Sequence, residues 1–174
     1  YLKYTSKTKE NLSSREKTKK IVALQAEKNK KDYKLPEMKF KTEIEEDNYQ
    51  NMQVFSLNNK KSKKQKVILY LHGGTFIKQP LKVHWEFMDL LAQNLDAKVI
   101  APLYPKAPAN NYKNTYPKLL KLFQDILKSA VEPEQLTIMG DSAGGNIALV
   151  LAICLKRAEI SQPKDIILLS PLVD

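Results

Sequence analysis

The chain has 174 residues, enough for one domain, and 43% of them are hydrophobic, which excludes wholesale disorder. Its formal net charge of +10 is uneven, because residues 1–66 carry 18 Lys and Arg against 9 Asp and Glu, whereas residues 67–174 carry 11 against 10. The basic excess lacks interleaved aromatic residues and any RNA-binding signature, which argues against nucleic acid as a partner.

Residues 1–37 form a Lys-rich N-terminal segment in which we expect one or two exposed helices between residues 6 and 34. Ser13 or Ser14 before Glu16 is typical of a capping box at a helix start. We expect the lysines of this segment to be solvated surface. The alternative is peripheral contact with an anionic membrane surface.

The remaining residues, 38–174, have the pattern of one α/β domain. Residues 38–47 and 49–58 partly alternate between apolar and polar around Asp47-Asn48, which predicts an antiparallel hairpin. Apolar runs and helical stripes then alternate along the chain. The predicted strands are 67–74, 97–102, 135–140 and 165–171, and the predicted helices are 80–96, 112–130 and one beginning near Gly144. This order predicts a mostly parallel sheet with helices on both faces and an antiparallel N-terminal hairpin.

The compartment is only weakly indicated. A single cysteine, Cys154, lies in an apolar run, where a buried inert thiol is expected. No apolar stretch approaches the roughly 20 residues of a membrane span, and no signal-peptide pattern is present. We slightly favour the cytoplasm. The alternative is membrane anchorage or export through a segment removed from before Tyr1.

All five glycines of the chain lie in two short motifs at predicted strand ends. The first motif is His72-Gly73-Gly74-Thr75, and the second is Gly140-Asp141-Ser142-Ala143-Gly144 followed by Gly145. Glycine is required where φ is positive or where another group approaches the backbone closely. The concentration of glycine here indicates two special backbone sites.

The second motif matches the G-x-S-x-G pattern of a nucleophile elbow. A sharp turn from strand to helix would hold Ser142 in a strained conformation, with Gly140 and Gly144 relieving the crowding around it. The helix N-terminus then favours negative charge at the Ser142 hydroxyl. The alternative is a serine in an ordinary tight turn.

The first motif closes the strand expected beside the elbow strand. We expect N–H groups of Gly73 or Thr75, Gly74 and Ala143 to form an oxyanion hole, in which each donor contributes about 3 kcal/mol. His72 is expected to brace this loop by a hydrogen bond rather than act as a base, and Asp141 to point away from Ser142 in a supporting role. The alternative for the HGG stretch is a turn that only ends a strand.

These residues resemble the α/β-hydrolase superfamily, and within it the hormone-sensitive-lipase-like esterases. "GDSAGGN" agrees with the family's elbow at all seven positions, whereas "HGGT" departs from its H-G-G-G motif at Thr75. "SPLVD" also resembles the family's segment after the next strand. The resemblance covers residues 38–174, as the N-terminal part of such a domain. It implies a serine carboxylesterase acting on short acyl esters, without metal or cofactor, in which residues 1–37 contribute to a cap.

A serine hydroxyl needs a base, and in this superfamily an acid and then a histidine follow the nucleophile. No histidine follows Ser142, because His72 and His84 both precede it. We expect His84 to be a surface or packing residue, and Asp174 to come one strand too early to be the triad acid. We therefore expect the chain to be truncated, with the triad Asp and His beyond residue 174.

Three functions remain open from the sequence. The first is a serine carboxylesterase that hydrolyses small-molecule esters through an acyl-Ser142 intermediate, the 174 residues given being inactive or nearly so. The second is a hydrolase-fold binding or scaffold protein without catalysis. The third is a lipase or peptidase on the same fold.

Overall fold

The computed structural model describes residues 14–129 and 131–173. In this part of the chain, strands and helices follow one another in the predicted α/β order, which confirms the fold class. The elements are α3 (Arg15–Asn29), β1 (Ile44–Asn48), β2 (Gln53–Leu57), β3 (Val67–Leu71), α4 (Lys82–Asn94), β4 (Lys98–Pro102), α5 (Tyr112–Lys128), the 3-10 turn η1 (Pro133–Gln135), β5 (Leu136–Asp141), α6 (Ala143–Arg157) and β6 (Asp165–Leu169).

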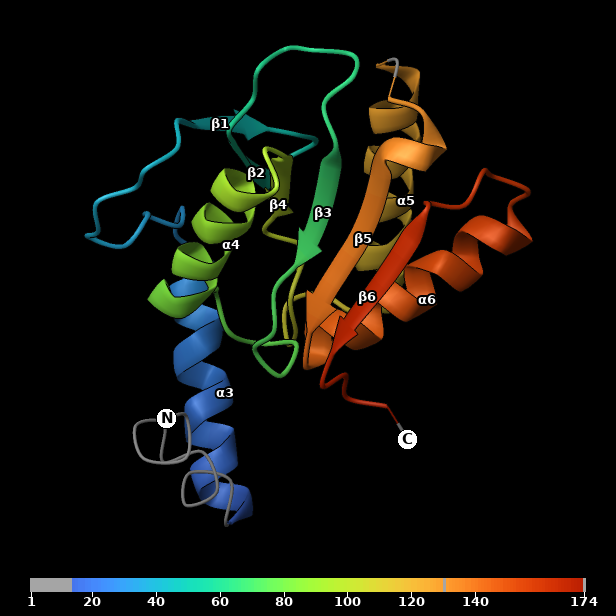
Figure 1. The fold of residues 1–174 in the computed structure, drawn as a ribbon. Helices are drawn as coiled ribbons and strands as arrows, with labels where there is room; N and C mark the ends of the chain where they lie inside the picture. The colour runs from blue at the N-terminus through green and yellow to red at the C-terminus, as the bar shows by residue number, and fades with distance from the viewer. Residues whose placement is uncertain (1–13, 130, 174) are drawn as a thin grey trace.

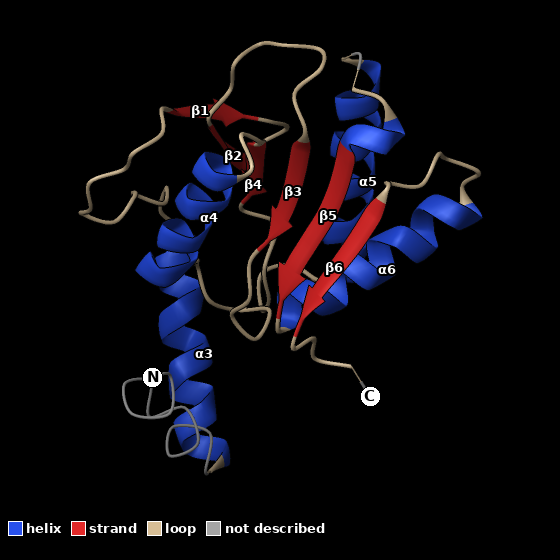
Figure 2. Cartoon of the chain, viewed as in Figure 1, coloured by secondary structure: helices blue, strands red, loops and turns tan. Residues whose placement is uncertain are grey.

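The six described strands form one sheet in the order β1-β2-β4-β3-β5-β6 (Figure 2). β4, β3, β5 and β6 run parallel to one another, whereas β1 and β2 form an antiparallel hairpin whose second strand joins β4. β3 lies near the middle, and all five of its residues are buried. Because β3 and β5 are parallel neighbours, the loops that follow them leave the sheet at the same edge.

The turn of the hairpin lies later than the sequence predicts. Tyr49 and Met52 exchange backbone hydrogen bonds of 2.8 and 3.0 Å, and Asn48 pairs with Gln53. Gln50 and Asn51, the two residues between, have φ of 52° and 60°. Two successive residues with positive φ make a turn whose twist matches that of the strands. Asp47 and Asn48, the expected turn residues, therefore belong to β1.

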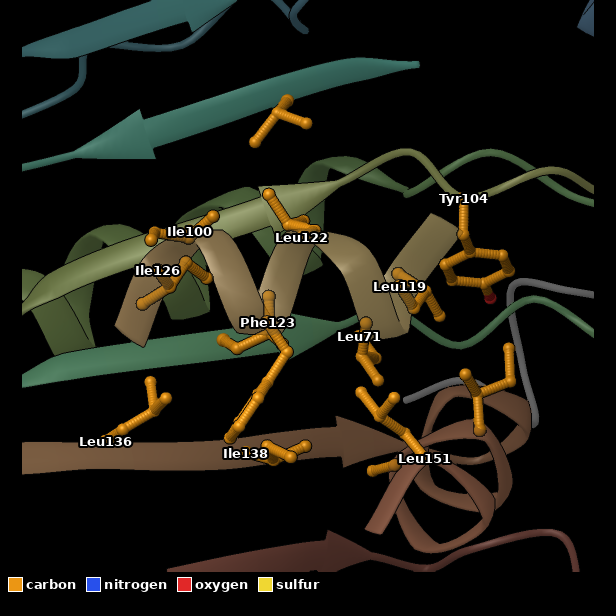
Figure 3. Packing of buried hydrophobic residues seen from close by; sticks show 14 of the residues in the cluster. Leu71, Ile100, Tyr104, Leu119, Leu122, Phe123, Ile126, Leu136, Ile138 and Leu151 are labelled. Atoms are coloured by element: carbon orange, nitrogen blue, oxygen red, sulfur yellow. The ribbon is translucent and has the colours of Figure 1, made fainter. Parts of the chain in front are cut away.

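Helices cover both faces of the sheet, as predicted. α5 and α6 pack on one face and α4 on the other, so the core has two layers (Figure 1). In Figure 3 the apolar stripe of α5 faces side chains of β3, β4 and β5. The stripe residues are Leu119, Leu122, Phe123 and Ile126. On the opposite face, Trp85 and Met88 of α4 are fully enclosed.

α3 is the helix expected in the N-terminal segment, and residues 6–13 of that prediction lie outside the described residues. Ser14 caps α3 by accepting from the N–H of Lys17 at 3.2 Å. The helix has no buried residue, and it projects on the side toward which β3, β5 and β6 point (Figure 1). Among the described residues, no helix is both long and apolar enough to cross a membrane.

Candidate active site

Ser142 lies at a sharp junction between β5 and α6. Its φ and ψ are 49° and −118°, a backbone conformation with positive φ that residues other than glycine rarely adopt and that costs about 1–3 kcal/mol. The Ser142 N–H donates to the Leu169 carbonyl, and the Ser142 carbonyl accepts from the Leu172 N–H; both N···O distances are 2.9 Å. The end of β6 and the residues after it therefore hold the turn in place. The strained turn predicted from the sequence is therefore present.

Gly144 permits the close packing of α6 against the sheet at this junction. A Cβ atom on Gly144 would fall on the carbonyl oxygen of Leu71, at the end of β3. Any larger residue would push the start of α6 away from β3. The glycine thus sets how near the elbow lies to the loop that follows β3.

Asp141 joins the elbow to that loop. Its Oδ1 accepts from the Gly73 N–H at 2.8 Å and from the Tyr70 hydroxyl at 2.8 Å. Burial raises the pKa of Asp141, but the hydrogen bonds from His84, Tyr70 and Gly73 outweigh burial and lower it overall. The carboxylate is therefore held ionised between two loops, directed at the loop rather than at Ser142.

His84 is not the surface or simple packing residue that the sequence suggests. Its side chain is 12% exposed, and its Nε2 lies 3.3 Å from Oδ2 of Asp141. Its Nδ1 accepts from the Leu81 N–H at 2.8 Å, so we assign the ring proton to Nε2, which donates to the carboxylate. His84 thus connects α4 to the elbow. Nothing in the local sequence signals this contact, because the partner is 57 residues away.

Gly73 does not have the role of oxyanion donor expected from the sequence, because its N–H already donates to the Asp141 carboxylate. The N–H groups of Gly74, Thr75 and Ala143 have no acceptor among the residues that the structure describes. Gly74 has φ of 141°, and Thr75 adopts φ of 54°, which is unusual for a β-branched residue. Of the four donors expected from the sequence, these three therefore have no acceptor among the described residues.

His72 braces its own loop, as the sequence suggests. Nδ1 lies 2.7 Å from the carbonyl of Gly73 and must donate to it, so Nε2 carries the free lone pair and has no partner among the described residues. The ring stacks on Tyr104 with centroids 4.7 Å apart, and the Tyr104 hydroxyl donates to the His72 carbonyl at 2.6 Å. Burial, followed by the charge of Lys106, lowers the pKa of His72 well below its usual range.

An apolar cavity of about 250 Å³ lies beside these loops. Phe76 from the loop after β3 and Ile147 from α6 line it, together with Tyr104, Pro105 and Tyr116. Ile147 follows Ser142 by little more than one turn of helix, so the cavity lies near the elbow. It is smaller than most ligand pockets, which span roughly 300–1,000 Å³.

Neither histidine is hydrogen-bonded to the Ser142 hydroxyl. Both ring nitrogens of His84 are occupied by Leu81 and Asp141, and Nδ1 of His72 by Gly73. Nε2 of His72 is enclosed, with the residue only 3% exposed. Asp174 lies outside the described residues. The described part of the chain thus brings together a strained serine and free donors, and shows no base in contact with that serine.

Comparison with known proteins gives a family match over residues 68–174, to the model described as the alpha/beta hydrolase fold. An esterase of Acinetobacter venetianus is 34% identical over 108 residues, which cover 62% of this chain and 36% of that protein. Esterase LipU of Mycobacterium tuberculosis is 30% identical over 109 residues, which cover 63% of this chain and 36% of that protein. The match therefore spans about a third of the length of these curated relatives.

Solved structures share the same architecture. A crystal structure of a Staphylococcus aureus protein matches 92% of this chain and 54% of its own length, with a TM-score of 0.87 at 26% identity. An esterase from the bacterial hormone-sensitive lipase family matches 90% of this chain and 57% of its own length, with a TM-score of 0.72. At 19% identity, the second likeness concerns the fold alone.

Proposed function

Because this chain belongs to the family with the α/β-hydrolase fold, we propose that Ser142 is the nucleophile of a carboxylic ester hydrolase. The observation that carries the proposal is the geometry of Ser142. It has a strained backbone at a strand-to-helix turn. That turn and the neighbouring loop supply the N–H groups of Gly74, Thr75 and Ala143, which have no acceptor in the described part of the chain. This arrangement suits attack on a carbonyl carbon and stabilisation of the resulting oxyanion.

The proposed reaction has two half-reactions. The Ser142 oxygen attacks the ester carbonyl and loses its proton to a base, the oxyanion accepts hydrogen bonds from the three N–H groups, and the alcohol leaves with a proton. Water then attacks the acyl-Ser142 ester and releases the acid. In this scheme Asp141 and His84 hold the loop that supplies Gly74 and Thr75, and they are positioning residues.

We propose esters with a short acyl chain as the substrates. The apolar cavity of about 250 Å³ beside Phe76 and Ile147 supports this choice, because it is smaller than most ligand pockets, which span roughly 300–1,000 Å³. The position of α3, on the side toward which β3, β5 and β6 point, is consistent with residues 1–37 acting as part of a cap (Figure 1).

The test uses the natural gene product that contains residues 1–174. A fluorophosphonate probe should form an adduct on Ser142, located by mass spectrometry, and Ser142→Ala should abolish both the adduct and hydrolysis of p-nitrophenyl acetate. Hydrolysis should fall as the acyl chain of the p-nitrophenyl ester is lengthened.

The scaffold hypothesis predicts the opposite result of the same experiment. A folded protein with neither adduct nor turnover would refute the esterase and leave a binding protein on the hydrolase fold. Faster cleavage of long-chain esters or peptides would instead favour a lipase or a peptidase.

A further inference from the structure

A second cavity, of about 370 Å³, lies between the end of α3, the hairpin turn and the segment after β4. It shares Tyr104, Pro105 and Asn110 with the apolar cavity, so the two adjoin. Their linings differ in kind, because the second cavity is largely polar. Its lining includes four lysines, Lys30, Lys31, Lys106 and Lys118, and one carboxylate, Asp32.

Lys106 is the buried member of this set. It is 6% exposed, and its Nζ donates to the carbonyl of Tyr104 at 2.9 Å and lies 4.9 Å from the Tyr104 ring centroid. No described carboxylate lies within ion-pair distance of it, and burial lowers its pKa to about 7. A buried ammonium without a counter-charge is unfavourable, and two of its three N–H donors remain for another acceptor.

The other lysines leave the cavity positive. Lys30 pairs with Glu27 at 2.6 Å on the exposed side of α3, and Lys118 donates to the carbonyl of Gln50 at 2.8 Å. With Asp32 in the lining and Glu27 paired to Lys30, two carboxylates stand against four lysines, and a positive excess remains. A concave site with an excess of one sign of charge concentrates ions of the opposite sign.

We propose that this polar cavity binds the anionic oxygen group of a small molecule, a carboxylate or a phosphate, with Lys106 as its buried counter-charge. The anion supplies the acceptor and the negative charge that Lys106 lacks among the described residues. The inference does not depend on the chemistry of Ser142, because it concerns a different cavity and a different side chain.

The test is isothermal titration of the natural gene product that contains residues 1–174, at slightly acidic pH, with inorganic phosphate and succinate in separate titrations against chloride of equal ionic strength. Lys106→Met is compared with Lys98→Met, which removes the same charge from a half-buried lysine at the opposite end of β4. We expect wild type and Lys98→Met to bind equally, and Lys106→Met to bind about tenfold more weakly or worse, as loss of a charge-assisted hydrogen bond predicts.

Binding of phosphate alone, of succinate alone, or of both supports the site and shows which anion it takes. Absence of saturable binding to wild type overturns the proposal. Equal affinity in Lys106→Met also overturns it, as does an equal loss in Lys98→Met, which would indicate general attraction to a basic protein.

A second measurement needs no variant. Acetic anhydride acetylates the neutral form of a lysine, and mass spectrometry follows each site. The anion that binds should slow acetylation of Lys106 in the wild type and leave Lys98 unaffected. Equal slowing of both lysines, or of neither, contradicts the proposal.

Discussion

Asp141 is the side chain through which three separate segments meet at the elbow. It accepts from Gly73 and Tyr70 and pairs with His84, so the loop after β3 and the start of α4 are both tied to the residue before Ser142. A displacement of about 1 Å in such a constellation is enough to impair catalysis. The charge of Asp141 therefore matters to stability and to the proposed donor geometry together.

Asp141→Asn should make the free energy of unfolding depend less on pH in the acidic range. The pKa of Asp141 is lowered in the folded protein, so its charge stabilises the fold above the ordinary carboxyl pKa, and this contribution is lost as pH falls through the lower, folded value. Urea unfolding at neutral pH and at pH ~3 should show that the free energy of unfolding falls more in wild type than in the variant. Asp165→Asn, at an exposed strand end, is the matched control and should behave like wild type. Equal losses in wild type and Asp141→Asn would contradict this role.

Gly144→Ala should destabilise the protein although alanine favours helices. Helix propensity alone would make the change favourable by about 1 kcal/mol. The added Cβ would, however, overlap the Leu71 carbonyl, which is main chain and has no room to move. We expect a net loss of about 2 kcal/mol or more in the free energy of unfolding, measured in urea. Ile153→Ala, at an exposed position of the same helix, should change it by less than about 0.5 kcal/mol; a similar loss there would refute the steric argument.

At the scale of elements, α3 and the segment that follows it differ in how they are held. α3 buries none of its residues, whereas Tyr33 stacks on Trp85 with centroids 5.9 Å apart and accepts from its indole N–H at 2.6 Å. The Tyr33 hydroxyl also donates to the Pro80 carbonyl at 3.0 Å. Within α3 only the last residue, Asn29, makes a side-chain hydrogen bond to the rest of the described domain, to the Ile77 carbonyl at 2.8 Å, so Tyr33 is the main anchor of the N-terminal segment.

Ala23→Pro should break α3 and leave the core intact. Ala23 is exposed in the middle of the helix, so we expect weaker far-ultraviolet circular dichroism with a urea midpoint close to that of wild type. Tyr33→Ala should instead lower the free energy of unfolding by about 2–4 kcal/mol, because it removes a packed ring and two hydrogen bonds. If Ala23→Pro lowered the midpoint as far as Tyr33→Ala, α3 would have to be part of the core.

At the scale of the whole molecule, the sheet is covered unevenly. β3 is buried on both faces, whereas at the β6 edge Ile166 and Ile167, which point to opposite faces, are 38% and 39% exposed. Leu172 and Val173 add exposed apolar surface beside them. Among the described residues β6 pairs with β5 alone, and a strand edge that has no partner and carries apolar side chains is a site for association with another chain.

The polypeptide of residues 1–174 should therefore self-associate through β6. We expect sedimentation velocity to show oligomers whose share rises with concentration, and expect Ile167→Lys to shift the population toward monomer. Leu24→Lys removes an apolar side chain of α3 that is 55% exposed, more than Ile167, and should have no such effect. A chain that stays monomeric, or that responds equally to both changes, would contradict the prediction.

Periodicity and glycine placement were enough to predict the order of strands and helices, the mixed sheet and the strained turn at Ser142, because these depend on neighbours along the chain. The partners of individual polar groups were not predictable in this way. Gly73 lost its expected role to Asp141, 68 residues away, and His84 gained a contact 57 residues away. Likewise, Lys106 is buried because of the way the segment after β4 packs, and no described carboxylate lies within ion-pair distance of it. Such contacts arise where the sheet brings distant loops to one edge, and no local pattern records which side chains then meet.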